Sequence, residues 1–413
     1  MIEGSEGAAR SNRERISLIV RVLRMMPALS ALAVMAGIGA MATITGSCGR
    51  SVFATATSTS SATATATGTP GAGAFLYAGN QADGTVSQYK RSQTTGALSA
   101  AGTAKAGVAR GPVGLTVDPT GTFLYLANPG DGLHQYKINQ KTGALAALSS
   151  NNGLVKAGNA PQWVALATVG GANFAYATNF NSGSISQYQV ESSGKLLSKG
   201  SVSSNLLTNP FGAAATGSFL YVSDQGNGSM VSFPINSDGT LNAAQATATA
   251  SSAQSVRNPV VTLLDPTASF LYVSDMTTGF VSVFLTGGGA LPAFAQSVQS
   301  TTLGGAVGLA IASIPGGNEY LYVANQTANS ISLYIVNSST GLLTSAGLVF
   351  TSLALPTGLA VGTSSAGGAG PFLYVADQNA AEVIQFTINT INGSLSNPVS
   401  IASGNGPQFL AIP

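Results

Sequence analysis

The sequence has very few of the residues that most catalytic and metal sites need. Its 413 residues include one cysteine, Cys48, and one histidine, His134. That inventory cannot build an intrachain disulfide, a Cys/His zinc site or a Cys–His nucleophile pair. The sequence also has no G-x-S-x-G motif, and we interpret His134 as a surface residue in the middle of a strand, so no Ser–His–Asp triad is evident. We therefore expect neither a metal nor another cofactor.

Charged residues are scarce as well, at 7% of the chain. Five of the sixteen basic residues and three of the fourteen acidic residues precede residue 49, which leaves eleven of each sign in the remainder. A nearly neutral chain has no basic face for releasing counterions from a nucleic acid, so nucleic-acid binding is excluded. So few charges also argue against long amphipathic helices, whereas 51 glycines with abundant Ser, Thr and Val favour sheet.

The N-terminus predicts export. Arginines at positions 10, 13, 15, 21 and 24 precede an uncharged apolar run over residues 25–44, so residues 1–47 read as a signal that is not part of the fold. Gly46 and Ser47 directly before Cys48 resemble the lipobox of bacterial lipoproteins, in which the cysteine is lipidated. Two alternatives stay open: cleavage after residues 40–42, or an uncleaved membrane helix. The Ser/Thr/Ala-rich residues 48–74 then form a flexible tether, and the lipid is the only membrane contact we expect.

The rest of the chain, residues 75–413, repeats itself seven times. The hexapeptide FLYVSD starts at Phe219 and again at Phe270, and five near-copies accompany it. The tyrosines of the seven copies are about fifty residues apart, a period typical of propellers, solenoids and arrays; they are Tyr77, Tyr125, Tyr176, Tyr221, Tyr272, Tyr322 and Tyr374.

Each repeat divides into four short pieces bounded by Gly, Pro, Asp or Asn, which is typical of a four-stranded antiparallel meander. The second piece is apolar on both faces, so neighbouring sheets must cover both. A glycine opens the fourth piece of every repeat; the seven are Gly96, Gly143, Gly194, Gly239, Gly289, Gly341 and Gly393. The first repeat lacks a first strand, while the chain ends on one, residues 407–412. Joining the two closes a ring, so we predict an all-β, seven-bladed β-propeller in which the C-terminal strand completes the N-terminal blade.

The repeated [FY]-L-Y-V-[AS]-[ND] strand, the P-x-G-L-A-V strand and the T-G-x-L turn resemble the blade pattern of the seven-bladed propeller lactonases, a family that includes 6-phosphogluconolactonase and shares YVTN-type repeats. The resemblance covers all of residues 75–413. It implies hydrolysis of a lactone ring by polar groups at the mouth of the central channel. Motifs of this kind specify how blades pack rather than chemistry.

In such propellers the loops joining strands two and three, and those joining one blade to the next, open on one face. There we name Arg110 and Arg257 as candidates to clamp a carboxylate or phosphate, because each lies two residues before a blade proline. Glu382 and Asp377 are the candidates for activating water. Trp163 replaces a small residue found in other blades and either lines the mouth, stacking on a sugar, or simply packs. The Asn/Asp that ends each second strand reads as a turn cap; the series is Asn80, Asn128, Asn179, Asp224, Asp275, Asn325 and Asp377.

Two functions from different classes follow. The first is an exported enzyme that hydrolyses a small or sugar-derived lactone. The second is a non-catalytic propeller, tethered at the cell envelope, that binds a glycan, peptide or protein partner. We expect a monomer in both cases. The sparse charge at the mouth favours binding, and the family resemblance favours hydrolysis.

The N-terminal prediction can be checked directly. Intact-protein mass spectrometry of the chain expressed in a bacterium should find a mature N-terminus at Cys48 that carries acyl chains. An unmodified N-terminus at Thr43 would contradict lipidation.

Overall fold

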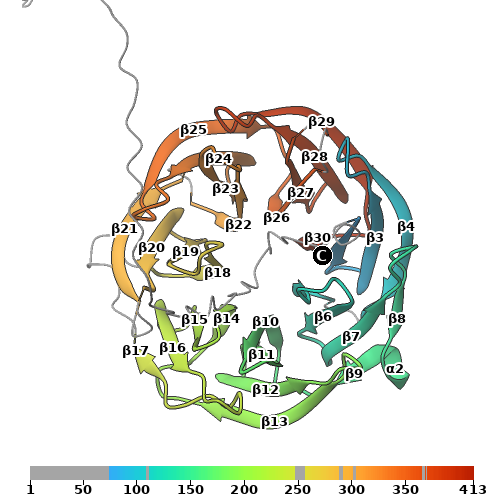
Figure 1. Ribbon diagram of the computed structural model, residues 1–413, viewed down its shortest axis with the longest axis vertical. Helices are drawn as coiled ribbons and strands as arrows, with labels where there is room; N and C mark the ends of the chain where they lie inside the picture. Colours follow the sequence, from blue (N-terminus) through green and yellow to red (C-terminus); the bar gives the residue numbers. More distant parts are fainter. Residues whose placement is uncertain are drawn as a thin grey trace, which may run out of the picture. The chain divides into compact units, whose positions relative to one another are not determined.

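The computed structural model describes residues 74–107, 111–246, 256–287, 292–300, 304–364, 368 and 370–413. These residues form seven antiparallel sheets around a central axis (Figure 1). Six sheets have four strands, and the seventh has a short fifth strand. The predicted seven-bladed propeller is confirmed. The export signal predicted over residues 1–47, its lipidation site Cys48 and the tether up to residue 73 lie outside the described residues.

We number the blades by their second strands and give each from the axis outward. Blade 1 comprises β30 (Pro407–Ala411), β2 (Phe75–Asn80), β3 (Thr85–Arg91) and β4 (Leu98–Lys105). Blade 2 comprises β5 (Gly114–Val117), β6 (Phe123–Asn128), β7 (Gly132–Ile138), β8 (Leu145–Ala147) and, after the one-turn α2 (Ser150–Gly153), β9 (Leu154–Val155). Blade 3 comprises β10 (Pro161–Val169), β11 (Ala172–Asn179), β12 (Ser184–Val190) and β13 (Leu196–Ser203).

The remaining blades repeat the same order. Blade 4 comprises β14 (Pro210–Ala215), β15 (Phe219–Asp224), β16 (Ser229–Pro234) and β17 (Gln245–Ala246). Blade 5 comprises β18 (Pro259–Leu264), β19 (Phe270–Asp275), β20 (Phe280–Leu285) and β21 (Ala293–Gln299). Blade 6 comprises β22 (Ala306–Ser313), β23 (Glu319–Asn325), β24 (Ser330–Val336) and β25 (Leu343–Thr351). Blade 7 comprises β26 (Pro356–Gly362), β27 (Phe372–Asp377), β28 (Glu382–Ile388) and β29 (Leu395–Ala402).

The ring closes within blade 1, as the split repeat predicts. Strand β30, from the C-terminus, pairs antiparallel with β2, so that Leu410 faces Ala78 and Phe409 faces Gly79. Two hydrogen bonds from side chains to backbone carbonyls join blades 7 and 1. The buried Arg91 donates to the carbonyl of Thr363 at 2.7 Å, and Gln385 donates to the carbonyl of Thr95 at 3.1 Å. The first described strands and the last strand of the chain therefore belong to one sheet (Figure 1).

The repeated F-L-Y strand and the repeated glycine turn contact each other at six of the seven blade interfaces in the described residues. The tyrosine hydroxyl of one blade donates to the carbonyl of the turn glycine of the next blade, at 2.7 to 3.0 Å. The six pairs are Tyr77–Gly143, Tyr125–Gly194, Tyr176–Gly239, Tyr272–Gly341, Tyr322–Gly393 and Tyr374–Gly96. The turn that corresponds to Tyr221 contains Gly289, which is outside the described residues.

The first aromatic of the same motif packs on the same glycine. All six glycines have φ between 70° and 83°, and a Cβ on any of them would lie 2.2 to 2.7 Å from that ring. Both the backbone conformation and the close approach therefore require glycine. Burial raises the pKa of Tyr374 to about 12, so its hydroxyl stays a neutral donor.

Removing one hydroxyl should weaken this interface measurably. In Tyr322→Phe the buried carbonyl of Gly393 loses its donor, which costs about 1–3 kcal/mol. We expect a thermal unfolding midpoint several degrees below that of the wild-type protein.

Tyr320→Phe is the matched control, because the buried Tyr320 donates to the carbonyl of Ile391, an exposed residue, and most blades carry Phe at this position. Equal midpoints for Tyr322→Phe and Tyr320→Phe would contradict a special role for the tyrosine–glycine bond.

Candidate functional site

The loops between strands two and three meet the loops that lead into each blade, on one face of the propeller. In six blades the first N–H after the second strand donates to the carbonyl just before the innermost strand, at 2.7 to 3.1 Å. The donors are Gln81, Phe180, Gln225, Met276, Gln326 and Gln378. We call this side the loop face. Blade 2 differs, because Pro129 stands at the donor position and has no N–H.

The Asn/Asp series is buried beneath the loop face, with every side chain at most 2% exposed. Asp275 is typical of the series: its carboxylate accepts N–H groups from Arg257 and Asn258 in the incoming loop and from Thr277 and Thr278 in the hairpin turn. In three other blades the side-chain amide of Asn80, Asn179 or Asn325 instead donates to two serine or threonine hydroxyls of the third strand. These residues cap their turns, and they also tie the two loops of each blade together.

The axis of the propeller is filled with apolar side chains. Gly114, Gly212, Gly308 and Gly358 let the innermost strands approach each other closely, whereas Trp163, Val261 and Phe409 occupy the equivalent places in other blades. Trp163 is 4% exposed, and its ring meets Phe409 edge to face with centroids 4.9 Å apart. The cavity that these side chains line is about 10 Å³, about the room that one water needs. The structure thus places Trp163 in a packed position on the axis.

The predicted carboxylates lie together at the loop-face end of blade 7. Asp377 ends β27, Glu382 begins β28, and the two are register partners. Asp377 is 2% exposed and accepts the Ala354 N–H on both oxygens, at 2.7 and 3.0 Å. Burial raises the pKa of Asp377, the Ala354 N–H opposes that rise, and the charge of Glu382 adds to it. Glu382 is partly exposed, so it is the carboxylate of the pair that solvent reaches.

The predicted arginines are not seen to converge on this pair. Arg257 is exposed in the loop that enters blade 5, two residues before Pro259. Arg110 lies outside the described residues. The same face also carries the exposed Asp83 and, in blade 2, Asp131.

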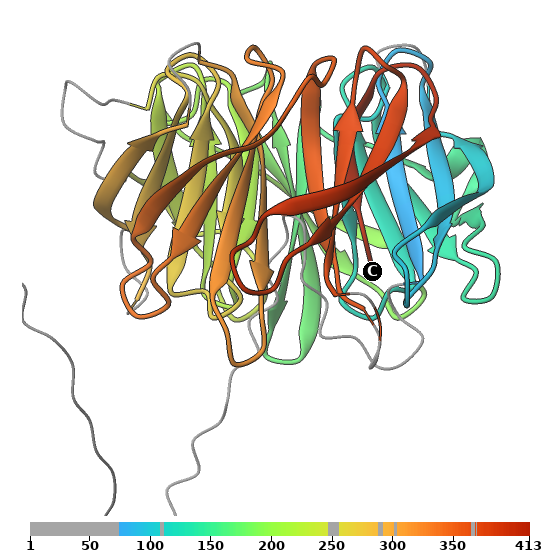
Figure 2. The same cartoon turned by 90° about the horizontal axis from the view of Figure 1, so that it is seen from above.

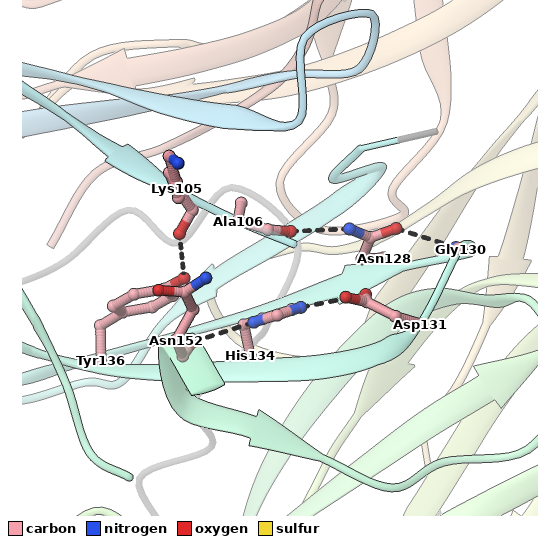
Figure 3. Close-up of polar contacts among 8 residues, drawn as sticks. All are labelled: Lys105, Ala106, Asn128, Gly130, Asp131, His134, Tyr136 and Asn152. Carbon is pink, nitrogen blue, oxygen red and sulfur yellow. Dashed lines mark hydrogen bonds and ion pairs between the residues drawn. The ribbon is translucent and has the colours of Figure 1, made fainter. Parts of the chain in front are cut away.

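The expectation that His134 is a surface residue is wrong: it is 1% exposed. Its Nε2 lies 3.0 Å from Oδ1 of Asp131 and its Nδ1 lies 2.9 Å from the carbonyl of Asn152 (Figure 3). Asn151 and Asn152 carry φ angles of 58° and 54°, so the turn of α2 bends over the position that serine occupies in other blades. The sequence feature that could have predicted this contact is the spacing of Asp131 and His134, which are three residues apart at a hairpin.

The described residues contain no cluster of metal-ligating side chains and no membrane-spanning helix. No three His, Cys, Asp or Glu side chains there are grouped so that they could hold a metal ion. None of the described residues belongs to a helix with the length and hydropathy of a membrane span.

Comparison with known proteins identifies the family. The profile described as "Lactonase, 7-bladed beta-propeller" matches residues 50–152, 128–306 and 293–411, so the chain belongs to this family. Among curated proteins, no sequence matches.

Solved structures share the fold at low identity. A periplasmic gluconolactonase of Pseudomonas aeruginosa superposes with a TM-score of 0.66 at 19% identity, over 82% of this chain and 99% of that one. A proposed 6-phosphogluconolactonase from Bacteroides fragilis gives 0.64 at 19% identity, over 81% and 96%. A second proposed 6-phosphogluconolactonase, from Bacteroides uniformis, gives 0.65 at 18% identity, over 81% and 98%. At identities this low, the superpositions establish a shared fold. The chemistry of the site has to be argued from the residues of this chain.

The close approach of the innermost strands predicts a sharp contrast between two glycines. A Cβ at Gly308 would lie 2.0 Å from the carbonyl oxygen of Thr357, whereas one at Gly287 would meet nothing within 4 Å. Gly308→Ala should destabilise the propeller by about 1–3 kcal/mol, the usual cost of overpacking, and Gly287→Ala should not. Thermal unfolding of both variants tests this, and an unchanged midpoint for Gly308→Ala would mean that the axis is looser than described.

Proposed function

We propose that this chain is an exported lactonase that hydrolyses a small or sugar-derived lactone at the loop face, with the carboxylate pair of blade 7 as its acid–base group. Membership of the lactonase family supports this proposal. The observation that carries it is the pair itself, in which a partly exposed Glu382 adjoins a buried Asp377 whose pKa is raised. Two carboxyl groups in unlike environments are the usual arrangement for dividing base and acid roles.

The proposed reaction needs only water and the lactone. Glu382 accepts a proton from water as the water oxygen adds to the lactone carbonyl carbon. The ring C–O bond then breaks, and the leaving oxygen takes a proton, which gives a hydroxy acid. A raised pKa keeps a larger share of Asp377 protonated, and that form can supply this proton. Arg257, with Arg110 in the equivalent loop of blade 2, would bind a carboxylate or phosphate on the substrate.

We extend the proposal to location and assembly. The basic and apolar N-terminal residues and the G-S-C sequence ending at Cys48 support export to the cell envelope with a lipid anchor there. The Ser/Thr/Ala-rich tether would hold a monomeric propeller away from the membrane. A soluble secreted or periplasmic form is the alternative if Cys48 is not lipidated.

One observation favours the second function, a non-catalytic propeller that binds a glycan, peptide or protein partner. The axis is filled by Trp163, Phe409 and Val261, and the carboxylate of Asp377 already caps a loop. A loop face with these properties can bind a ligand without catalysing its hydrolysis.

A panel of lactones separates the two functions. The purified full chain should hydrolyse at least one sugar-derived lactone faster than buffer, and Glu382→Gln should lose about 100-fold or more of kcat, the usual contribution of general base catalysis. Hydrolysis would be followed by the acid released at constant pH.

The matched control is Glu319→Gln, which changes the same group at the start of β23, where Glu319 accepts the Ser313 hydroxyl at 2.8 Å in the hairpin joining strands one and two. Asp377→Asn should keep the fold, because Asn occupies the equivalent place in four blades, while altering the dependence of kcat on pH. No turnover on any lactone, or full turnover in Glu382→Gln, would contradict the enzymatic proposal.

A further inference from the structure

A second, larger cavity lies between blades 2 and 3, at the opposite ends of the strands from the loop face. Its volume is about 440 Å³, within the range of small-molecule sites. One side is the turn over residues 118–122, which joins β5 to β6, and another is the turn after β12 that contains Glu191 and Ser192. None of the carboxylates or arginines proposed for lactone hydrolysis lines it.

The cavity exists because the first hairpin of blade 3 is unusually long. Strands β10 and β11 have nine and eight residues, compared with six each for β14 and β15 in the next blade. The hairpin therefore projects beyond its neighbours on this side of the propeller, where Figure 2 shows it in green. Gly170 and Gly171 form its tip with nothing within 4 Å of either Cβ position. Thr168 and Asn173, near this tip, form one wall of the cavity.

The wall contributed by blade 2 contains an aromatic ring that is partly exposed. Phe123 is half-buried, as is Phe219 of blade 4, whereas Phe75, Phe174 and Phe270 at the same motif position are 3%, 3% and 8% exposed. Gly194 of blade 3 packs on the Phe123 ring, and the ring also lines the cavity together with the apolar Leu166 and Val190. One part of the cavity is thus aromatic and apolar.

The rest of the lining is polar and has free capacity for hydrogen bonds. The Asn173 side-chain oxygen accepts the Thr168 hydroxyl at 2.7 Å, and its NH₂ group has no bond among the described residues. Lys137 is exposed and forms no ion pair among the described residues, and the Glu191 carboxylate accepts a hydrogen bond from the Ser193 hydroxyl at 3.2 Å. Asp118 faces the cavity too, but its oxygens already accept the N–H groups of its own turn, from Thr120, Thr122 and Phe123.

From this lining we propose that the cavity is a binding site for one or two sugar units of a carbohydrate. A sugar ring has an apolar face that stacks on an aromatic ring and a rim of hydroxyls that exchange hydrogen bonds with carboxylate, ammonium and amide groups. Phe123 provides the stacking surface, and Asn173, Lys137 and Glu191 surround it with both donors and acceptors. The site is independent of the loop face, so it does not rest on the proposed hydrolysis.

Calorimetric titration of the purified full chain with glucose, cellobiose and N-acetylglucosamine tests this site. At least one of these sugars should bind saturably at millimolar concentration. Asn173→Trp, which fills the cavity from an exposed position, should weaken binding at least tenfold, and so should Lys137→Gln, which provides a second reading if the tryptophan disturbs the hairpin. Lactone turnover, if present, should be unchanged in both variants.

The matched control is Lys90→Gln. Lys90 has the same place in β3 as Lys137 has in β7, because it pairs with Phe75 as Lys137 pairs with Phe123, and it does not line the cavity. Binding kept in Lys90→Gln and lost in the other two variants supports the site. The proposal is overturned if none of the sugars binds, if both cavity variants bind as well as wild type, or if amino acids bind there and sugars do not.

Discussion

The propeller depends on one contact between neighbouring blades. A tyrosine hydroxyl from the second strand of one blade meets the carbonyl of a glycine in the last turn of the next, while the preceding aromatic lies on that glycine. The two parts of the contact depend on each other. The glycine is required because an aromatic ring packs directly against it, and the buried tyrosine hydroxyl requires the glycine carbonyl as its acceptor. Since each blade presents the donor to one side and the acceptor to the other, the contact specifies the direction in which the blades follow one another around the ring.

This contact also explains which parts of the fold can be predicted from the sequence. The F-L-Y strand and the glycine turn recur because they bind each other, so counting their repeats is enough to count the blades. The split repeat reveals the closure, because the last residues match the first strand of a repeat and β30 pairs with β2, the second strand of the first repeat. The repeats predict the fold because each blade packs against its neighbour through equivalent contacts, which need similar residues at equivalent positions.

The candidate site was harder to predict, because sites depend on departures from the repeat. His134 occupies a serine position, and that alignment suggested a surface residue; its burial comes from α2 and β9, an irregularity in the outer strand of blade 2 that has no counterpart in the described residues of the other blades. Trp163 stood out as a large residue among glycines, yet only the structure shows that it packs against Phe409 across the axis. Asp377 belongs to a capping series and also adjoins Glu382, and a linear pattern cannot separate these two roles.

The closure has a further consequence for the order in which the molecule is assembled. A chain released from its N-terminus onward can finish six sheets while β2 still has a bare inner edge, and an unpaired edge is open to pairing with another chain. Pairing of β30 with β2 ends that exposure. A chain cut before β30 would therefore keep this edge of β2 exposed, even with its other six sheets formed.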